Sequence, residues 1–343
     1  MKNPNSYLIT GGAGFIGSSF SRMQKAQGAK VVILDALTYA GHRENVEGFE
    51  LVVGDICDGR LVSDLLVQHQ ITTLINFAAE SHVDRSIDSP SAFIETNIKG
   101  TFNLLNASHE YFKKLNSAEQ GGFKYIQVST DEVYGSLGPT GKFSETTQYA
   151  PNSPYSASKA AGDHLARAWF HTYGLPTITS NCSNNYGPRQ FPEKLIPTMI
   201  LCAVRGKPLP VYGDGGNIRD WIHVEDHCRG ITLAIQKGRP GETYCFGGNA
   251  EKNNLDVVQM ICHELDQIHP RKDGKSYDTQ ISFVKDRLGH DRRYAIDDSK
   301  AEKELGFTRK FQFDSGLRDT IRWYLDNLPW CESVVSKEKE KKS

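Results

Sequence analysis

The 343-residue sequence predicts an α/β protein with a doubly wound parallel sheet and a smaller α+β lobe after it. Short apolar, partly β-branched runs alternate with longer amphipathic segments through the first half. A glycine-rich turn separates the first apolar run from the first helical segment. After about residue 185 the alternation gives way to proline- and glycine-rich sequence. Together these features favour βαβ units followed by a less regular lobe.

The alternating runs define the expected elements in chain order. Strands are predicted at residues 6–10, 30–34, 49–54, 72–78 and 124–130. Helices are predicted at residues 15–27, 59–69, 91–115 and 154–173. Strands joined through helices form a parallel sheet, because each crossover returns the chain to the same edge. The polar segments 116–122 and 271–280 are predicted to be loops.

The domain organisation follows from the same pattern. Residues 1–185 are predicted to form a nucleotide-binding domain, with some later strands returning to its sheet. Residues 186–330 are expected to form mainly a substrate-binding lobe. Residues 331–343 end in KEKEKKS, which has high charge and no apolar face, so we expect a disordered tail.

Composition excludes several classes of partner. A net charge of −1 and a pI near 6.8 give no general attraction to nucleic acid or to an anionic membrane. No apolar stretch reaches the ~20 residues that span a bilayer, and the N-terminal sequence lacks a signal-type apolar segment. Seven scattered cysteines without a CxxC pair predict free thiols and a cytoplasmic location. The spacing of the histidines, including His82, His223 and His290, predicts no metal site.

The glycine-rich turn has the context of a dinucleotide-binding site. Gly11, Gly14 and Gly17 follow a predicted strand and open a predicted helix, where glycine lets the backbone approach a pyrophosphate. Asp35 ends the second predicted strand, where a carboxylate binds ribose hydroxyls and repels a 2′-phosphate. NAD is therefore favoured over NADP. Asp55, before Ile56, is either an adenine contact or a helix N-cap.

Two groups of reactive residues predict oxidation and dehydration. Tyr155 and Lys159 share one face of a predicted helix, and a neighbouring ammonium is expected to lower the pKa of the phenol. Such a pair suits hydride chemistry at a carbinol. Thr130, Asp131 and Glu132 end an apolar run, so that one carboxylic acid can protonate a leaving hydroxyl while the other removes a carbon-bound proton.

The segments GGAGFIGS, AAESHVDRSI, STDEVYG, YSASKA, NCSNNYGP, FPEKLIP and GHDRRYAID are spread along the chain. With them the sequence resembles the extended short-chain dehydrogenase/reductase family over about residues 6–325, and within it the 4,6-dehydratases of nucleotide-diphosphate sugars. Epimerases of this family usually carry small residues where this chain has Asp131 and Glu132. The resemblance implies a Rossmann-type fold, bound NAD and the substrate dTDP-glucose.

The resemblance also implies a role for each reactive residue. Tyr155, supported by Lys159, takes the proton from the sugar O4 as hydride leaves C4, and Thr130 holds O4. Glu132 removes the C5 proton, Asp131 protonates the departing O6, and hydride returns to C6. Dehydratases for CDP-, UDP- or GDP-hexoses, and a non-catalytic NAD-binding regulatory protein, are the alternatives. The family further implies a homodimer through the helix that carries Tyr155 and Lys159 and its neighbour.

Motif and resemblance together predict two sets of contacts. The cofactor contacts are Gly11, Gly14, Phe15, Ile16, Gly17, Asp35, Thr38, Asp55, Ile56, Phe77, Ala78, Ala79, Ser81, Thr96, Tyr155, Lys159 and Asn185. The substrate contacts are Ser81, Thr130, Asn184, Lys194, Leu195, Pro210, Val211, Tyr212, Arg219, Asn254, Arg287 and His290.

Three of the substrate positions leave alternatives open. Arg219 offers a planar fork to a diphosphate, or pairs with Asp220 or Asp226. Tyr212 stacks on a base, or packs in the core. Leu288 stands where the family commonly has proline, and the lost φ restraint is expected to loosen the loop near His290.

Overall fold

The computed structural model describes residues 5–342, and the side chains of residues 5–336. Its largest element is a seven-stranded sheet in the order β10-β6-β5-β4-β1-β2-β3, in which every pair of neighbours is parallel. The strands are β1 (Ser6–Thr10), β2 (Lys30–Asp35), β3 (Glu50–Val53), β4 (Thr73–Asn76), β5 (Lys124–Thr130), β6 (Thr177–Cys182) and β10 (Thr243–Phe246). The predicted parallel α/β fold is confirmed. β10 comes from the second half of the chain and completes one edge of this sheet.

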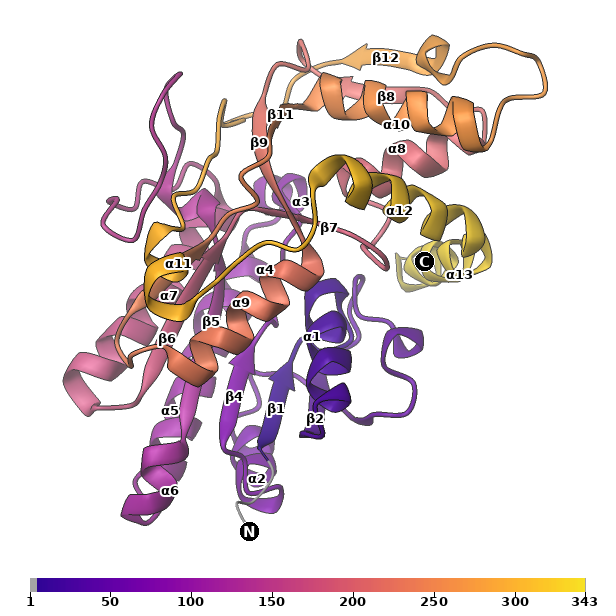
Figure 1. Cartoon of the computed structure of the whole chain (residues 1–343). Helices are drawn as coiled ribbons and strands as arrows, with labels where there is room; N and C mark the ends of the chain where they lie inside the picture. Colours follow the sequence, from indigo (N-terminus) through magenta and orange to yellow (C-terminus); the bar gives the residue numbers. More distant parts are fainter. Residues whose placement is uncertain (1–4, 343) are drawn as a thin grey trace.

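Helices cover both faces of the sheet, because successive side chains of a strand point to opposite sides (Figure 1). Ile9 packs in one core with α1 (Phe15–Ala26) and α9 (Val224–Lys237). Leu8 packs in the opposite core with α2 (Gly59–Gln68), α5 (Thr101–Phe112) and α7 (Pro154–Tyr173). The apolar runs of the first half therefore serve two cores at once, which explains why they do not alternate with polar residues.

The predicted helix at 91–115 is interrupted. It consists of α4 (Ser91–Phe93), a π-helical segment η2 (Ile94–Gly100) and α5. Asn97 lies in the π-helical segment and exchanges hydrogen bonds of 2.9 and 3.0 Å with the backbone of Glu80. The same side chain donates to Ser158 Oγ at 2.8 Å, which ties the segment after β4 to α7.

The second lobe lies over one end of the sheet (Figure 1). It contains a three-stranded sheet of β11 (Glu251–Asn253), β9 (Ile218–His223) and β7 (Asn184–Tyr186), and a parallel pair of β12 (Ile281–Val284) and β8 (Leu209–Tyr212). Its core is formed by α8 (Leu195–Val204), α10 (Asn254–Ile268) and α12 (Phe313–Asp326). Shorter elements are α3 (Val83–Asp88), α11 (Ser299–Leu305) and the 3₁₀ turns η1 (Arg43–Val46), η3 (Asp131–Tyr134) and η4 (Tyr277–Gln280).

The loop predicted at 116–122 is wrong, because this segment forms the helix α6 (Ser117–Gly122). Asn116 Oδ1 accepts hydrogen bonds from the backbone N–H groups of Ala118 and Glu119, each at 3.0 Å. Glu119 Oε2 accepts in return from the backbone N–H of Asn116 at 3.0 Å, which completes a capping box. This cap starts a short helix that the glycine content of the segment concealed.

The disorder predicted from residue 331 onward is also wrong within the described residues. The helix α13 (Leu328–Lys342) occupies this segment, and Cys331 and Val334 are fully buried on it. Val334 packs against Tyr39 and Phe191, which belong to the two halves of the molecule. The sequence prediction overlooked these apolar positions because a highly charged run follows them. Residue 343 lies outside the described residues.

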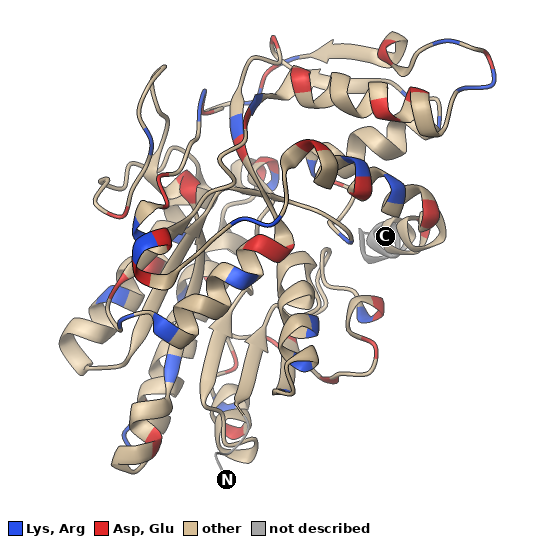
Figure 2. Ribbon diagram, in the orientation of Figure 1, with Lys and Arg blue, Asp and Glu red and all other residues tan. Residues whose placement is uncertain are grey.

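Within residues 5–342, no helix is both long and apolar enough to cross a membrane. Acidic and basic side chains are interspersed over the ribbon of both lobes (Figure 2).

We expect Val334→Ala to lower the free energy of unfolding by about 1–3 kcal/mol, because a fully buried valine loses its apolar contacts. Glu332→Ala, at an exposed position on the same helix, should change it by less than about 0.5 kcal/mol. Urea-induced unfolding measures both variants. Equal stability of the two would show that α13 does not pack as described.

Candidate active site

A cavity of about 580 Å³ lies between the carboxyl ends of the sheet strands and the second lobe. This is the place where doubly wound sheets bind ligands, because the loops after neighbouring strands diverge there. The cavity brings together all the predicted cofactor and substrate residues except Val211. Val211 is buried in the core of the second lobe and does not line the cavity, so its role as a substrate contact stays a prediction.

The glycine turn after β1 has the shape that a pyrophosphate site requires. Gly11 has a φ of +66°, and a Cβ atom there would lie 2.5 Å from the backbone nitrogen of Ala78. A Cβ at Gly17 would lie 2.4 Å from the carbonyl oxygen of Gly11. Gly14 caps α1 without a side chain, so the first amides of this helix remain available at the cavity wall. These residues fit the phosphates of a dinucleotide.

Asp35 stands at the end of β2, as the sequence predicted. Its carboxylate accepts hydrogen bonds from the backbone N–H groups of Ala13 and Leu37, each at 2.8 Å, and lines the cavity. Asp55 also lines the cavity, and the cap of α2 is Asp58, which accepts from Arg60 N and Leu61 N. The alternative that made Asp55 the helix N-cap is therefore wrong.

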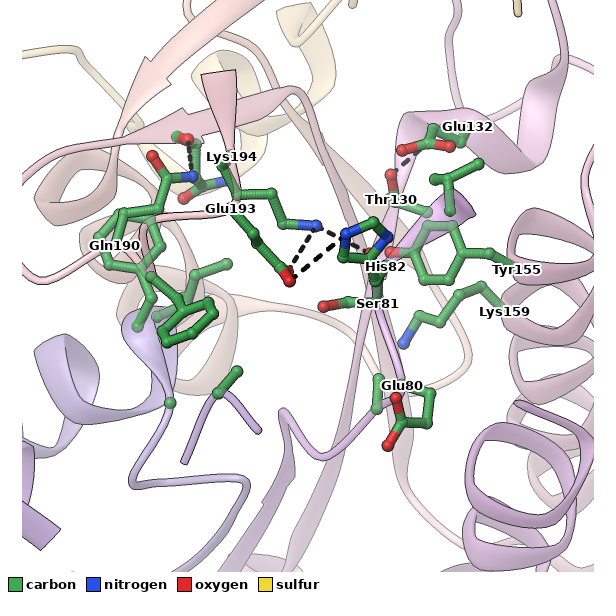
Figure 3. A pocket seen from close by; sticks show the side chains of 18 of the residues that line it. Glu80, Ser81, His82, Thr130, Glu132, Tyr155, Lys159, Gln190, Glu193 and Lys194 are labelled. Carbon is green, nitrogen blue, oxygen red and sulfur yellow. Dashed lines mark hydrogen bonds and ion pairs between the residues drawn. The ribbon is translucent and has the colours of Figure 1, made fainter. Parts of the chain in front are cut away.

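The reactive residues come from the end of β5 and the start of α7. Thr130 ends β5, and its Oγ1 accepts a 3.3 Å hydrogen bond from Glu132 N, which caps the turn η3. A capping box at Ser153 starts α7 and places Tyr155 and Lys159 on one buried face. Figure 3 shows both side chains extending from the helix to the same side, with the Tyr155 ring between Lys159 and Thr130.

Different neighbouring charges act on the two buried carboxyl groups of Asp131 and Glu132. Asp131 is 2 % exposed, and burial, then the charges of Glu132 and Asp220, hold its pKa well above the ordinary value. Burial also raises the pKa of Glu132, but the charges of Arg219, Lys194 and Arg287 oppose that rise. Asp131 is therefore the better proton donor and Glu132 the better carboxylate base.

The pKa predicted for Tyr155 differs from the structure. Burial, and next the charge of Glu132, hold its pKa well above the ordinary value of a phenol. Lys159 is buried too, and its Nζ donates a 2.7 Å hydrogen bond to the carbonyl oxygen of Val128. Burial lowers the pKa of Lys159. The sequence showed the two groups to be neighbours but could not show that desolvation outweighs their attraction.

Arg219 adopts neither of the ion pairs considered from the sequence. Asp220 accepts from backbone N–H groups of Gly248 and Ala250, and Asp226 pairs with Arg229. The Arg219 guanidinium instead donates to the carbonyl oxygens of Ile218 and Asp291, and lies 4.3 Å from the ring centre of Tyr294. It lines the cavity with its charge unpaired by these carboxylates, as a diphosphate site requires.

The wall beside Arg219 consists of Tyr212 and the loop at residues 285–291. Tyr212 is 38 % exposed, so the core-packing alternative is wrong. The Arg287 guanidinium lies 5.3 Å from the ring centre of Tyr212 and donates to Asp84 of α3, with a 2.9 Å bond from its second nitrogen. Leu288 is 71 % exposed and makes no comparable anchor, so the loop is held by Arg287 across the cavity mouth.

Glu80 and Glu193 also line the cavity and were not predicted from the sequence; Glu193 lies between His82 and Lys194 (Figure 3). His82 Nε2 lies 3.6 Å from Glu193 Oε2, and Lys194 Nζ lies 3.4 Å from Glu193 Oε1. Lys194 also donates to the carbonyl oxygen of Ser81 at 2.9 Å. The signal was available, because Glu193 directly precedes Lys194 in FPEKLIP. Across the described residues, no three His, Cys, Asp or Glu side chains cluster as a metal site would require.

Comparison with known proteins places the chain in one family. The family model of GDP-mannose 4,6 dehydratase matches residues 8–320. A dTDP-glucose 4,6-dehydratase of Xanthomonas campestris pv. campestris is 56% identical over 336 residues, with 96% of each chain covered. The dTDP-glucose 4,6-dehydratase of Streptomyces venezuelae, solved with NAD and dTDP bound, has a TM-score of 0.87 at 42% identity, covering 96% of this chain and 99% of its own. A UDP-glucose 4-epimerase of Thermus thermophilus, solved with NAD, has a TM-score of 0.84 at 28% identity, covering 94% and 99%.

We expect Asp131→Asn to gain stability relative to the unmodified protein as pH rises above about 4. A raised folded-state pKa means that the folded protein holds this proton more tightly, so stability falls with rising pH by up to about 1.4 kcal/mol per unit until the group ionises. An asparagine has no such proton to lose. Thermal unfolding of both proteins across pH measures the difference.

Asp273→Asn is the control with the opposite sign. Hydrogen bonds from Arg271 and from the backbone of Lys275 lower the pKa of this exposed carboxyl, so its variant should lose relative stability as pH rises. A pH-independent difference between Asp131→Asn and the unmodified protein would contradict a protonated Asp131.

Proposed function

The chain belongs to the extended short-chain dehydrogenase/reductase family, among the dTDP-glucose 4,6-dehydratases, and we propose from this premise how it acts. It converts dTDP-glucose to dTDP-4-dehydro-6-deoxy-glucose with NAD as a resident cofactor. The reaction is a hydro-lyase reaction, and the product supplies deoxysugar synthesis.

The observation that carries this function is the carboxyl pair of Asp131 and Glu132 in the same cavity as Tyr155 and Lys159. The fold alone does not separate the candidates, because a UDP-glucose 4-epimerase shares it with a TM-score of 0.84. Epimerisation at C4 needs only the redox pair, whereas loss of water also needs an acid for the leaving hydroxyl and a base for the carbon-bound proton. This chain has both groups, with pKa values separated by their surroundings.

Bound NAD supplies the hydride acceptor at C4 and the donor at C6. Tyr155 takes the proton from O4 as its phenolate, which the neighbouring Lys159 ammonium favours against the effect of burial, and Thr130 holds that oxygen at the end of β5. Glu132 removes the C5 proton, which the new 4-keto group has made acidic. Asp131 delivers its proton to O6, so that the C6–O6 bond breaks and water leaves. Glu132 returns a proton to C5 when C6 has been reduced.

The second lobe holds the nucleotide diphosphate. Arg219 and Arg287 present guanidinium groups to the phosphate oxygens, and Tyr212 offers an exposed ring face for the base. Lys194 and the amide of Asn184 face the sugar end of the same cavity. These contacts orient C4 toward Tyr155 and C6 toward Asp131, since the sugar is attached to the phosphate that they hold.

A homodimer through α5 and α7 is part of the proposal. Phe102 and Tyr173 are exposed large side chains on these two helices, and Ile94 is exposed just before α5. Ala157 is exposed on α7 and Ala161 is half-buried, so a small-residue stripe allows close helix packing, while Ala160 is used within the chain. Sedimentation at micromolar protein measures the assembly. The predicted cytoplasmic location stays a prediction.

Incubation with four nucleotide sugars tests the function and its alternatives. We expect dTDP-glucose to yield an alkali-detectable 4-keto product, with CDP-glucose, UDP-glucose and GDP-mannose much slower. Faster turnover of another nucleotide sugar would mean that the enzyme carries out the same 4,6-dehydration on that substrate instead of dTDP-glucose. Absence of product from all four, with NAD bound, would favour a non-catalytic NAD-binding protein.

The redox step and the elimination should separate by mutation. Asp131→Asn and Glu132→Gln keep Tyr155 and Lys159, so both should oxidise C4 and accumulate enzyme-bound NADH while product formation slows by about 10²-fold or more. Tyr155→Phe should not form NADH, because O4 keeps its proton. Absorbance of the reduced nicotinamide and product release are followed in the same sample.

Exchange of the C5 hydrogen with deuterated solvent distinguishes the two carboxyl variants. It should be largely lost in Glu132→Gln and retained in Asp131→Asn. If both variants dehydrate the substrate as fast as the unmodified protein, Asp131 and Glu132 have only a structural role. The chain would then act like an epimerase.

A further inference from the structure

Helix α7 carries a third buried ionisable residue in line with Tyr155 and Lys159. Asp163 lies four residues beyond Lys159, so the three side chains follow one another along one face of the helix. Asp163 is 4 % exposed and does not line the cavity. The reaction described above gives it no task, although an unpaired buried carboxyl group is costly.

Two hydroxyl groups hold Asp163 in place. Ser129 Oγ donates to its Oδ2 at 2.6 Å, and Tyr149 Oη donates to the same oxygen at 3.1 Å. Ser129 belongs to β5 and directly precedes Thr130, so the carboxyl group is anchored to the strand that carries the reactive residues. Both donors are neutral and leave its charge uncompensated.

Lys159 and Asp163 are the two groups of opposite charge in this buried region. Burial lowers the pKa of Lys159, and the Asp163 carboxylate is the largest influence opposing that fall. Burial raises the pKa of Asp163 to about 6, and Lys159 is the largest influence opposing that rise. The other titratable groups that face the pair have pKa values raised by burial and stay neutral: Cys182 on β6, Tyr149, Tyr134 on η3 and Tyr125 on β5.

We propose that Asp163 is a positioning residue for the oxidation step, acting as the buried counter-charge that keeps Lys159 an ammonium behind Tyr155. The carboxylate acts through Lys159, since it touches neither the cavity nor the reacting atoms. Lys159 Nζ has a neutral partner in the carbonyl oxygen of Val128, so that contact orients the ammonium while Asp163 maintains its charge. The inference rests on the proposed roles of Tyr155 and Lys159.

The test is the pH profile of kcat/KM for dTDP-glucose in Asp163→Asn. Without the carboxylate, Lys159 loses its proton at lower pH, so the alkaline limb should move down by about one pH unit or more. On the alkaline side of the profile the loss of kcat/KM should be roughly tenfold or greater, and it should shrink as pH falls. Asp163→Glu keeps the charge and should return the alkaline limb toward its original position.

Asp226→Asn is the matched control. Asp226 is a buried carboxylate on α9 that accepts from the backbone N–H groups of Lys310 and Phe311 at 3.0–3.1 Å, outside the cavity. Its variant should lose thermal stability and keep the shape of the pH profile. If Asp163→Asn changes kcat/KM by the same factor at every pH, as a structural role would, the inference is overturned.

Tyr149→Phe provides a second measurement if Asp163→Asn does not fold. Loss of this hydroxyl raises the pKa of Asp163, so the acid limb should move to higher pH. An unchanged acid limb in folded Tyr149→Phe would also overturn the inference. Inactivity of the unmodified protein toward dTDP-glucose would instead refute the proposed function, so the two failures are distinguishable.

Discussion

The hydrogen bond from Lys159 Nζ to the carbonyl oxygen of Val128 joins α7 to β5 two residues before Thr130. It fixes the rotation of the helix against the strand, because the lysine side chain is buried and has little freedom. Tyr155 lies one helical turn earlier and is thereby directed at the strand end. The redox residues of the helix and the acid–base residues of the turn η3 consequently share one site.

The carboxyl pair makes the site depend on both lobes. Asp131 and Glu132 belong to the sheet domain, but the cations that oppose protonation of Glu132 come from the second lobe: Arg219 on β9, Lys194 before α8 and Arg287 near the cavity mouth. Without these charges, burial would raise the pKa of Glu132 further, so that less of its carboxylate would be available as the base for C5. The second lobe must therefore lie against the sheet domain for Glu132 to act as a base while Asp131 acts as an acid.

Sequence pattern predicted the sheet well, because strands such as β1 and β2 carry apolar residues on both faces and are separated by helical segments. It failed at α6 and α13, where a cap at Asn116 and a few apolar residues before a charged run decide the structure. Motifs located the reactive residues, yet the raised pKa of Tyr155 depends on burial that only packing determines. Glu193 could have been predicted from its position directly before Lys194 in FPEKLIP, whereas its contacts with His82 and Lys194 follow only from the fold.

The central claim is that one sugar meets the redox pair and the acid–base pair in the same cavity before it leaves. The direct measurement is the fate of deuterium placed at C4 of dTDP-glucose, followed by NMR of the product. We predict deuterium at C6 of the same molecule and one solvent hydrogen at C5. Deuterium lost to solvent, or retained at C4, would contradict oxidation, elimination and reduction within a single site.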